Sequence, residues 1–251
     1  MSQTHPDLFV AWQDRVRRGI YPVARLRAED NAEGRTLYEF RYIRGAQEAR
    51  ERGFIEFDSF PKLTDTYRGF ELFPFFKNRV MPPNRPDYAG YVAELGLSVE
   101  TADPLTLLAR SGGLRATDRL EIYAAPKPQS DASSCVWSFL LRGIRHLPAS
   151  AEQRIATLSP GARLYVMRDV QNQHSSSALL LRSDDKVNLG YIPDLLVDDL
   201  AGRDLSFDNF IVTVAQINPH PSPVQHRVLC NLQTRWPDAY RPFMSERFNP
   251  I

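Results

Sequence analysis

A stretch rich in proline, serine and alanine divides this 251-residue chain into two halves. It reads AAPKPQSDASS over residues 124–134, and the apolar periodicity stops before it and resumes after it. This composition is typical of linkers, because proline and small polar residues disfavour both helices and strands. The length also suffices for two domains of about 100 to 150 residues each. We therefore expect domains at 1–124 and 135–251, joined by a linker at 125–134.

The first half alternates strand and helix signals. Its candidates are strands at residues 20–27 and 36–44, helices at 85–97 and 103–113, and a closing strand at 117–126. Each helix has a proline near its start and glycine near its end, as Pro104 and Gly112 do in the second one. Asp103 precedes that helix as its expected N-cap. This order predicts a small α/β domain, with the aromatic stretch 67–76 packed in its core.

The second half consists mainly of short strands separated by turn formers. The strand candidates are residues 136–145, 162–168, 178–182, 187–192, 209–217 and 227–234. Two short helices are expected, at 150–158 and 193–202. Several short strands at this spacing are typical of a small β-barrel. The sequence as a whole therefore predicts an α+β protein.

Composition excludes several classes of protein. No run approaches the roughly 18 apolar residues of a membrane span, and MSQTHPDLFV at the N-terminus lacks the basic and apolar regions of a secretory signal. The two cysteines, Cys135 and Cys230, are too few for a disulfide framework, and the five histidines show no metal-ligand spacing. We therefore expect a cytoplasmic protein without a metal or other cofactor.

Arginine dominates the basic residues. The net charge is only +1, so bulk electrostatic steering towards nucleic acid is not expected. Lysine accounts for only four of the 31 basic residues, however, and arginine suits bidentate contacts to phosphates and base edges. A GC-rich genome would enrich arginine as well, so the arginine content alone does not decide between nucleic-acid binding and genome composition as its cause.

Three motifs in the second half resemble the HIRAN domain family. They are GIRH at 143–146, RDVQNQHSSSALLL at 168–181 and LGYIPDLLVDDL at 189–200. The resemblance covers most of residues 135–235. It implies a small β-barrel related to the OB and SH3 folds, which in a eukaryotic member of the family holds the 3′ end of single-stranded DNA.

The HIRAN resemblance also implies which residues would bind DNA. By position these are Arg145, His146, Arg168, Asp169, His174, Ser175 and Tyr191. The family has a base-stacking tyrosine and a hydroxyl-binding aspartate where this chain has His174 and Ser175; histidine can still stack and serine can still accept a hydrogen bond. Taken singly, each residue also fits an ordinary strand end or solvated loop. The hypothesis therefore depends on four segments meeting on one face of the barrel.

Residues 21–126 resemble the N-terminal subdomain of HipA-type toxin kinases. The matching segments are VARL, LYEFRYIR, FPKLTDTYRGFELFPFFKNRVMPP and LLARSGGLRATDRLEIYAAP. In some three-gene systems this subdomain stands alone as a separate antitoxin. The chain has no Gly-rich loop with a lysine strand and no His-Arg-Asp or Asp-Phe-Gly step, so phosphoryl transfer is not expected.

These observations favour a non-catalytic bacterial DNA-binding adaptor for single strands, ends or branched DNA, in a toxin–antitoxin or defence system. Arg145 would contact phosphate and His146 would stack on a base. One alternative is an antitoxin-like partner of a HipA-type kinase. A second is a metal-dependent DNA nuclease or nicking toxin. For that alternative, Asp118, Glu121 and Lys127 loosely imitate an Asp…Glu-x-Lys arrangement, although the spacing differs.

Overall fold

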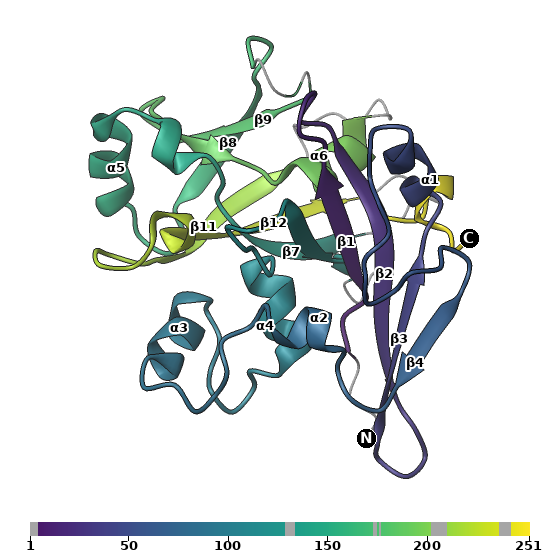
Figure 1. The fold of residues 1–251 in the computed structure, drawn as a ribbon. Coiled ribbons are helices and arrows are strands. Elements are labelled where there is room, and N and C mark those ends of the chain that lie inside the picture. Colours follow the sequence, from purple (N-terminus) through teal and green to yellow (C-terminus); the bar gives the residue numbers. More distant parts are fainter. Residues whose placement is uncertain (1–4, 129–133, 173–174, 176, 202–209, 236–241) are drawn as a thin grey trace. The chain divides into compact units, whose positions relative to one another are not determined.

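The chain forms two compact units. The computed structural model describes residues 5–128, 134–172, 175, 177–201, 210–235 and 242–251 (Figure 1). Unit 1 comprises Met1–Tyr91, Val99–Ala125 and Phe243–Ile251, and unit 2 comprises Val92–Ser98 and Pro126–Pro242. Each unit combines an antiparallel sheet with helices, so the expected α+β class is confirmed.

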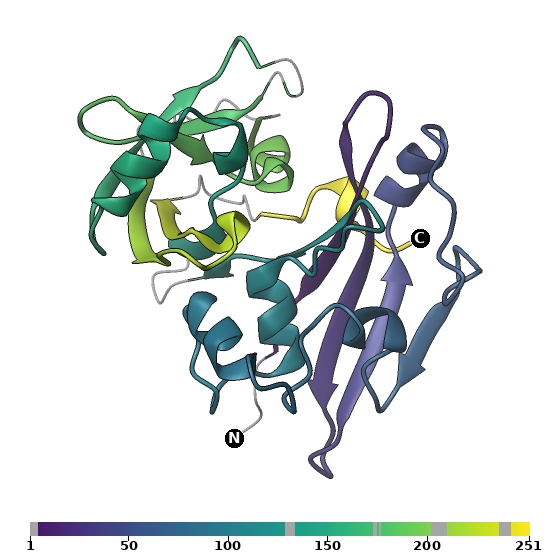
Figure 2. The ribbon, with the colours of Figure 1, turned by 60° about the vertical axis from the view of Figure 1, so that its left-hand side comes forward.

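Unit 1 is built on five antiparallel strands. They are β1 (Leu8–Gln13), β2 (Ile20–Asp30), β3 (Thr36–Tyr42), β4 (Thr66–Gly69) and β5 (Leu120–Ala124). Their order in the sheet is β4-β3-β2-β1-β5, so β5, the last strand of the unit in sequence, pairs with the first (Figure 2). The predictions of β2, β3 and β5 are confirmed. β1 and β4 were not predicted.

Four helices accompany this sheet, of which α3 runs across the division between the units. They are α1 (Gly45–Arg50), α2 (Pro74–Lys77), α3 (Tyr88–Glu94) and α4 (Pro104–Ser111). The ends of α4 are as predicted. The Asp103 carboxylate accepts hydrogen bonds from the backbone N–H groups of Leu105 and Thr106, and Gly112 ends the helix in the left-handed conformation.

Aromatic rings fill the core of unit 1. Phe40 stacks on Phe60 with ring centroids 3.8 Å apart. Tyr42 is fully buried and donates its hydroxyl proton to the Phe60 carbonyl oxygen. Burial raises the pKa of Tyr42, so its phenol stays neutral and keeps this hydrogen bond. Most rings of the stretch 67–76 pack against this core as expected, whereas Phe70 is half exposed.

The C-terminal residues Phe243–Ile251 belong to unit 1, although the sequence-based division placed them in the second domain. Phe243 and Phe248 each pack on Phe9, with centroid distances of 5.2 Å. An isolated antiparallel bridge then joins Pro250 to Ile43. These apolar and backbone contacts explain the difference, since they link segments that are more than 200 residues apart and leave no local sequence signal.

Unit 2 contains a seven-stranded antiparallel sheet. Its strands are β6 (Lys127–Pro128), β7 (Ser134–Leu140), β8 (Arg163–Arg168), β9 (Leu179–Arg182), β10 (Asn188–Tyr191), β11 (Ile211–Ile217) and β12 (Val228–Arg235). Their order is β10-β9-β8-β11-β12-β7-β6. An isolated bridge joins Arg142, just after β7, to Tyr191 at the end of β10, so the sheet curls into a half-barrel. β6 lies within the expected linker at 125–134 and pairs with β7, so part of that linker belongs to the sheet.

Two α-helices occur close to their predicted positions in unit 2: α5 (Ala149–Ala156) and α6 (Asp194–Ala201). The strand predicted at 136–145 ends earlier, at Leu140, because Gly143 takes the left-handed conformation with φ of +76°. A 3-10 turn, η1 (Ile144–His146), follows this glycine. The change from strand to turn redirects Arg145 and His146, which were expected at a strand end.

The short segment Val92–Ser98 belongs to unit 2 through polar contacts with the β11–β12 connection. The Asn218 side chain donates to the Glu94 carbonyl oxygen at 2.7 Å. His226 Nδ1 lies 2.8 Å from the Glu94 carboxylate.

Of the helices in the described part of the chain, none combines the length and apolar composition that a bilayer span requires.

Candidate nucleic-acid interface

Tyr191 connects three of the segments that the sequence assigned to the site. Its hydroxyl donates to Asp169 Oδ2 at 2.9 Å, which ties the end of β10 to the segment after β8. Its backbone exchanges hydrogen bonds with Arg142, of 2.8 and 3.0 Å. The ring lies against Gly143, where a Cβ atom would approach Tyr191 Cδ2 to 2.8 Å. The segments around 143, 169 and 191 therefore meet at one place.

The two glycines of the predicted motifs make this meeting possible. A Cβ atom on Gly190 would lie 2.6 Å from the Arg142 carbonyl oxygen and 2.6 Å from Leu141 Cγ. The φ of Gly190 is +148°, a value that side chains of L-residues rarely allow. Gly143 combines a positive φ with the close contact to Tyr191. The glycines of GIRH and LGYIP are thus required by backbone conformation and close packing, independently of any ligand.

Asp169 organises the start of the β8–β9 connection. Its backbone N–H donates to the Ala178 carbonyl oxygen at 2.9 Å, which closes the connection at its base. Its carboxylate accepts from the Asn172 side chain at 3.3 Å as well as from Tyr191. Asn172 Oδ1 in turn accepts from the Ser175 N–H at 3.1 Å. The carboxylate therefore positions the loop that carries Ser175. Asn172 was not singled out from the sequence, although it stands inside the quoted motif.

Partial burial and the Asp169 carboxylate both raise the pKa of Tyr191. The phenol consequently stays protonated around neutral pH and remains a hydrogen-bond donor, because burial and the nearby carboxylate both favour its uncharged form. The ring is only partly buried, at the rim of the curled sheet. A partly exposed ring held by its hydroxyl is compatible with an aromatic contact on its open side.

Of the remaining predicted residues, Arg145, His146 and Arg168 lie in the described part of the chain. Arg145 and His146 are exposed, and Arg145 Nε donates to His146 Nε2 at 3.0 Å. They stand two and three residues after Gly143, in the turn η1 that follows the Gly143–Tyr191 contact. Arg168 ends β8 in an exposed position next to Asp169. His174 lies outside the described residues.

A row of exposed side chains along β8 was not predicted from the sequence. Arg163, Tyr165 and Met167 alternate with Leu164, which is buried, and Val166, which is half-buried. The signal was present in RLYVMR, where a tyrosine and a methionine occupy the exposed phase of an alternating strand. Single exposed apolar side chains are common on protein surfaces, but here two of them, Tyr165 and Met167, stand on the same face of one strand.

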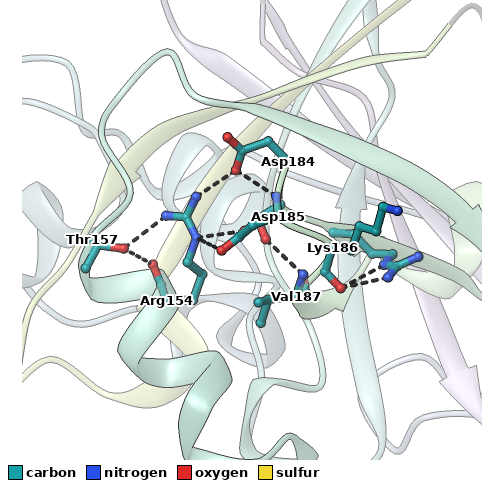
Figure 3. A network of polar contacts seen from close by, with 8 residues as sticks. Arg154, Thr157, Asp184, Asp185, Lys186 and Val187 are labelled. Atoms are coloured by element: carbon teal, nitrogen blue, oxygen red, sulfur yellow. Dashed lines mark hydrogen bonds and ion pairs between the residues drawn. The ribbon is translucent and has the colours of Figure 1, made fainter.

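Three of the carboxylates that could suggest a nuclease are bound to arginines. Asp118 accepts two hydrogen bonds from the buried Arg79, of 3.2 and 2.5 Å. Arg154 on α5 holds Asp184 and Asp185 in the β9–β10 turn, with distances of 2.7 and 2.9 Å (Figure 3). Within the described ranges, no group of three histidine, cysteine, aspartate or glutamate side chains is arranged to hold a metal ion.

Comparisons with known proteins do not assign the chain to a family. No protein-family model and no curated protein matches it. A solved structure, the crystal structure of a protein from Lactobacillus plantarum, is similar over 40% of this chain and 96% of its own chain, at 17% identity and a TM-score of 0.30. A similarity at this level carries no argument, so the HIRAN and HipA resemblances stay predictions.

Proposed function

We propose that unit 2 is a HIRAN-like barrel of the OB and SH3 type that binds single-stranded DNA, including strand ends and the single-stranded parts of branched DNA. The observation that carries this proposal is the contact of Tyr191 with both Gly143 and Asp169. It brings three of the four segments on which the hypothesis depends to one rim. In the fourth segment, His174 lies outside the described residues.

The proposed mechanism combines phosphate contacts with base stacking. Arg145 and Arg168 would contact phosphates, since guanidinium groups pair with phosphate oxygens in a bidentate manner. His146 and the open side of Tyr191 would stack on one or two unstacked bases, and each stacked base contributes about 1 to 3 kcal/mol. Asp169 would act through Tyr191 and the loop, as a positioning residue. No metal or cofactor takes part in this binding.

Binding of fluorescein-labelled oligo(dT), measured by anisotropy, tests the proposal. We expect the double variant Arg145→Ala, His146→Ala to bind about tenfold more weakly or worse. We also expect its salt dependence to be shallower, by about 0.7 in the slope of log K against log salt for each lost phosphate contact. Arg115→Ala, which removes an exposed arginine of unit 1, serves as the charge control.

Unchanged affinity of the double variant would remove Arg145 and His146 from the site. Absence of any binding of single strands, overhangs or forks by the intact chain at low salt would refute DNA binding altogether. The cytoplasmic location and the toxin–antitoxin or defence context belong to the same proposal. The kinase-partner alternative stays a prediction, and co-purification with a HipA-type kinase would separate it from DNA binding.

A further inference from the structure

The curled sheet of unit 2 has one apolar and one polar face. Directly opposed residues of antiparallel strands lie on the same face. One face carries buried side chains in every pair near the centre of the sheet. They are Leu164 and Val212, Val212 and Leu232, Leu232 and Trp137, and Val214 and Cys230. The residues between them consequently point to the opposite face.

The opposite face, which we call the outer face, carries mainly polar or exposed side chains in its central rows, whereas Leu180, Leu229 and Leu140 on the same face are buried. Its rows are Tyr165, Arg182 and Asn188; Arg163, Thr213, Asn231 and Ser138; and Ile211 with Gln233. Tyr165 is 50% exposed and Met167 is 40% exposed. The Arg163 guanidinium lies 5.7 Å from the centre of the Tyr165 ring, within the range of a cation–π contact. An exposed ring flanked by arginine therefore stands in the middle of a polar surface.

Within the strands themselves, the charge on the outer face is positive. None of the seven strands described in unit 2 contains an aspartate or a glutamate. Arg163 and Arg182 both point to this face. The nearest acidic residues in sequence are engaged: the Asp169 carboxylate, directly after β8, accepts the Tyr191 hydroxyl, and Asp184 and Asp185 are paired with Arg154 (Figure 3). The surface is thus complementary to a polyanion.

Arg182 is held in place before any ligand arrives. Its Nε and Nη2 atoms donate to the Lys186 carbonyl oxygen at 3.2 and 2.7 Å. Its Nη1 atom lies 3.6 Å from Met167 Sδ. A guanidinium fixed in this way loses less side-chain entropy on binding than a free one.

The proposed Tyr191 site lies on the same face. Pairing places Tyr191 in one row with Leu180 and Met167, adjacent to the row of Tyr165 and Arg182. Two strand spacings across the sheet and two residues along it separate Tyr165 from Tyr191, which corresponds to about 12 Å between their Cα atoms. The two rings are therefore close enough to contact the same strand at different nucleotides.

We propose that the outer face of β8, β9 and β10 is a stacking platform along which a DNA single strand runs beyond the Tyr191 site. Tyr165 stacks on a base, while Arg163 and Arg182 contact the phosphates on either side. A duplex is a poor occupant, because its base faces are already covered by neighbouring bases. This inference rests on the proposed function and extends it from a terminal nucleotide to a continuous strand.

The test compares two lengths of oligo(dT), of about 16 and about 4 nucleotides, which bracket the site sizes of single-strand-binding barrels. We expect Tyr165→Ala to weaken binding of the long strand at least about fivefold, and Arg163→Ala, Arg182→Ala to weaken it similarly. The short strand, which the Tyr191 site accommodates, should lose much less. Tyr165→Phe keeps the ring and should bind as the wild type does.

Phe70→Ala is the matched control, because Phe70 is also 50% exposed and also lies under an arginine, but in unit 1. Unchanged binding of the long strand by Tyr165→Ala and by the double arginine variant would overturn the platform. The proposed function would then stand if Arg145→Ala, His146→Ala still weakened both lengths. Failure of the wild type to bind either length would refute both proposals.

Discussion

At the scale of single residues, glycine determines the geometry of the candidate site. Gly143 turns the chain out of β7, and Gly190 lets β10 approach the Arg142 backbone. The Tyr191 ring then covers Gly143 and its hydroxyl reaches Asp169. Sequence alone marked all four residues as parts of motifs. It could not indicate that the glycines contact the tyrosine, because that contact joins positions about 50 residues apart.

Gly190→Ala should destabilise unit 2. The added methyl group would overlap the Arg142 carbonyl oxygen, and the positive φ would strain any L-residue. We expect a loss of at least about 1 to 3 kcal/mol in the free energy of unfolding, measured by urea titration. Gly90→Ala is the control, because Gly90 lies in α3 with no atom within 4 Å of the added Cβ. That variant should be neutral or slightly more stable; equal stability of both variants would contradict the close approach.

At the scale of elements, the helices and strands that the sequence predicted correctly are those whose ends are marked by nearby residues such as caps, prolines and glycines. α4 was predicted at both ends because Asp103, Pro104 and Gly112 each act locally. α1 was not predicted, since Arg44 provides no side-chain cap and the helix is only six residues long. All six strands expected in the second half exist, with ends displaced by up to five residues. The largest displacement is at the end of β7, which was predicted at residue 145 from the apolar pattern. The strand ends at Leu140, because Gly143 takes the left-handed conformation.

The Arg154 clamp between α5 and the β9–β10 turn predicts a dependence of stability on pH. The Ser183 hydroxyl and the Arg154 guanidinium hold the pKa of Asp185 below its ordinary value of 3.8. A carboxyl whose folded pKa is lowered stabilises the fold above its unfolded pKa, and this stabilisation disappears as the pH falls through the folded pKa. Arg154→Gln should therefore melt at a lower temperature than the wild type near neutral pH.

The difference in melting temperature should shrink when the pH is lowered from about 5 to about 2, because Asp185 becomes protonated in both proteins. Differential scanning calorimetry over this range measures it. Arg115→Ala, the exposed arginine of unit 1, should match the wild type at every pH. A difference between Arg154→Gln and the wild type that stays constant down to the lowest pH would show that the clamp acts through packing instead of charge.

At the scale of the whole molecule, the path of the chain differs most from the sequence-based division. Composition placed a single boundary at residues 124–134, and the structure does divide the chain there. It also divides it at Tyr91/Val92, Ser98/Val99 and Pro242/Phe243, where no change of composition occurs. The reason is that Glu94 and Phe248 find their partners far away in sequence. Such long-range contacts leave no periodicity for a single sequence to reveal.

Phe248→Ala should destabilise unit 1, although residue 248 is close to the C-terminus. Phe248 is buried between Phe9 and Phe243, with centroid distances of 5.2 and 5.0 Å. Truncating a buried phenylalanine costs about 3 to 5 kcal/mol. Met244→Ala, in the same segment but 70% exposed, should change stability by less than about 0.5 kcal/mol. Equal unfolding midpoints in urea for the two variants would contradict the packing of Phe243–Ile251 in unit 1.

The candidate site was predictable only in part. Arg145, His146, Asp169 and Tyr191 were singled out because they stand in motifs, and the structure brings the segments around Gly143, Asp169 and Tyr191 together. Tyr165 was not identified: the alternation in RLYVMR was a signal, but it does not show by itself which face of β8 is exposed. That knowledge depends on strand pairing, which alternation within one strand suggests but does not fix.

The most direct test of the central claim is a map of where a single strand binds. Amide chemical shifts of the isotope-labelled protein, recorded during titration with oligo(dT), report this residue by residue. We predict shifts at Gly143, at Asp169 and along β8, with unit 1 unaffected. Shifts confined to unit 1, or none at saturating oligonucleotide, would contradict the assignment of DNA binding to the curled sheet of unit 2.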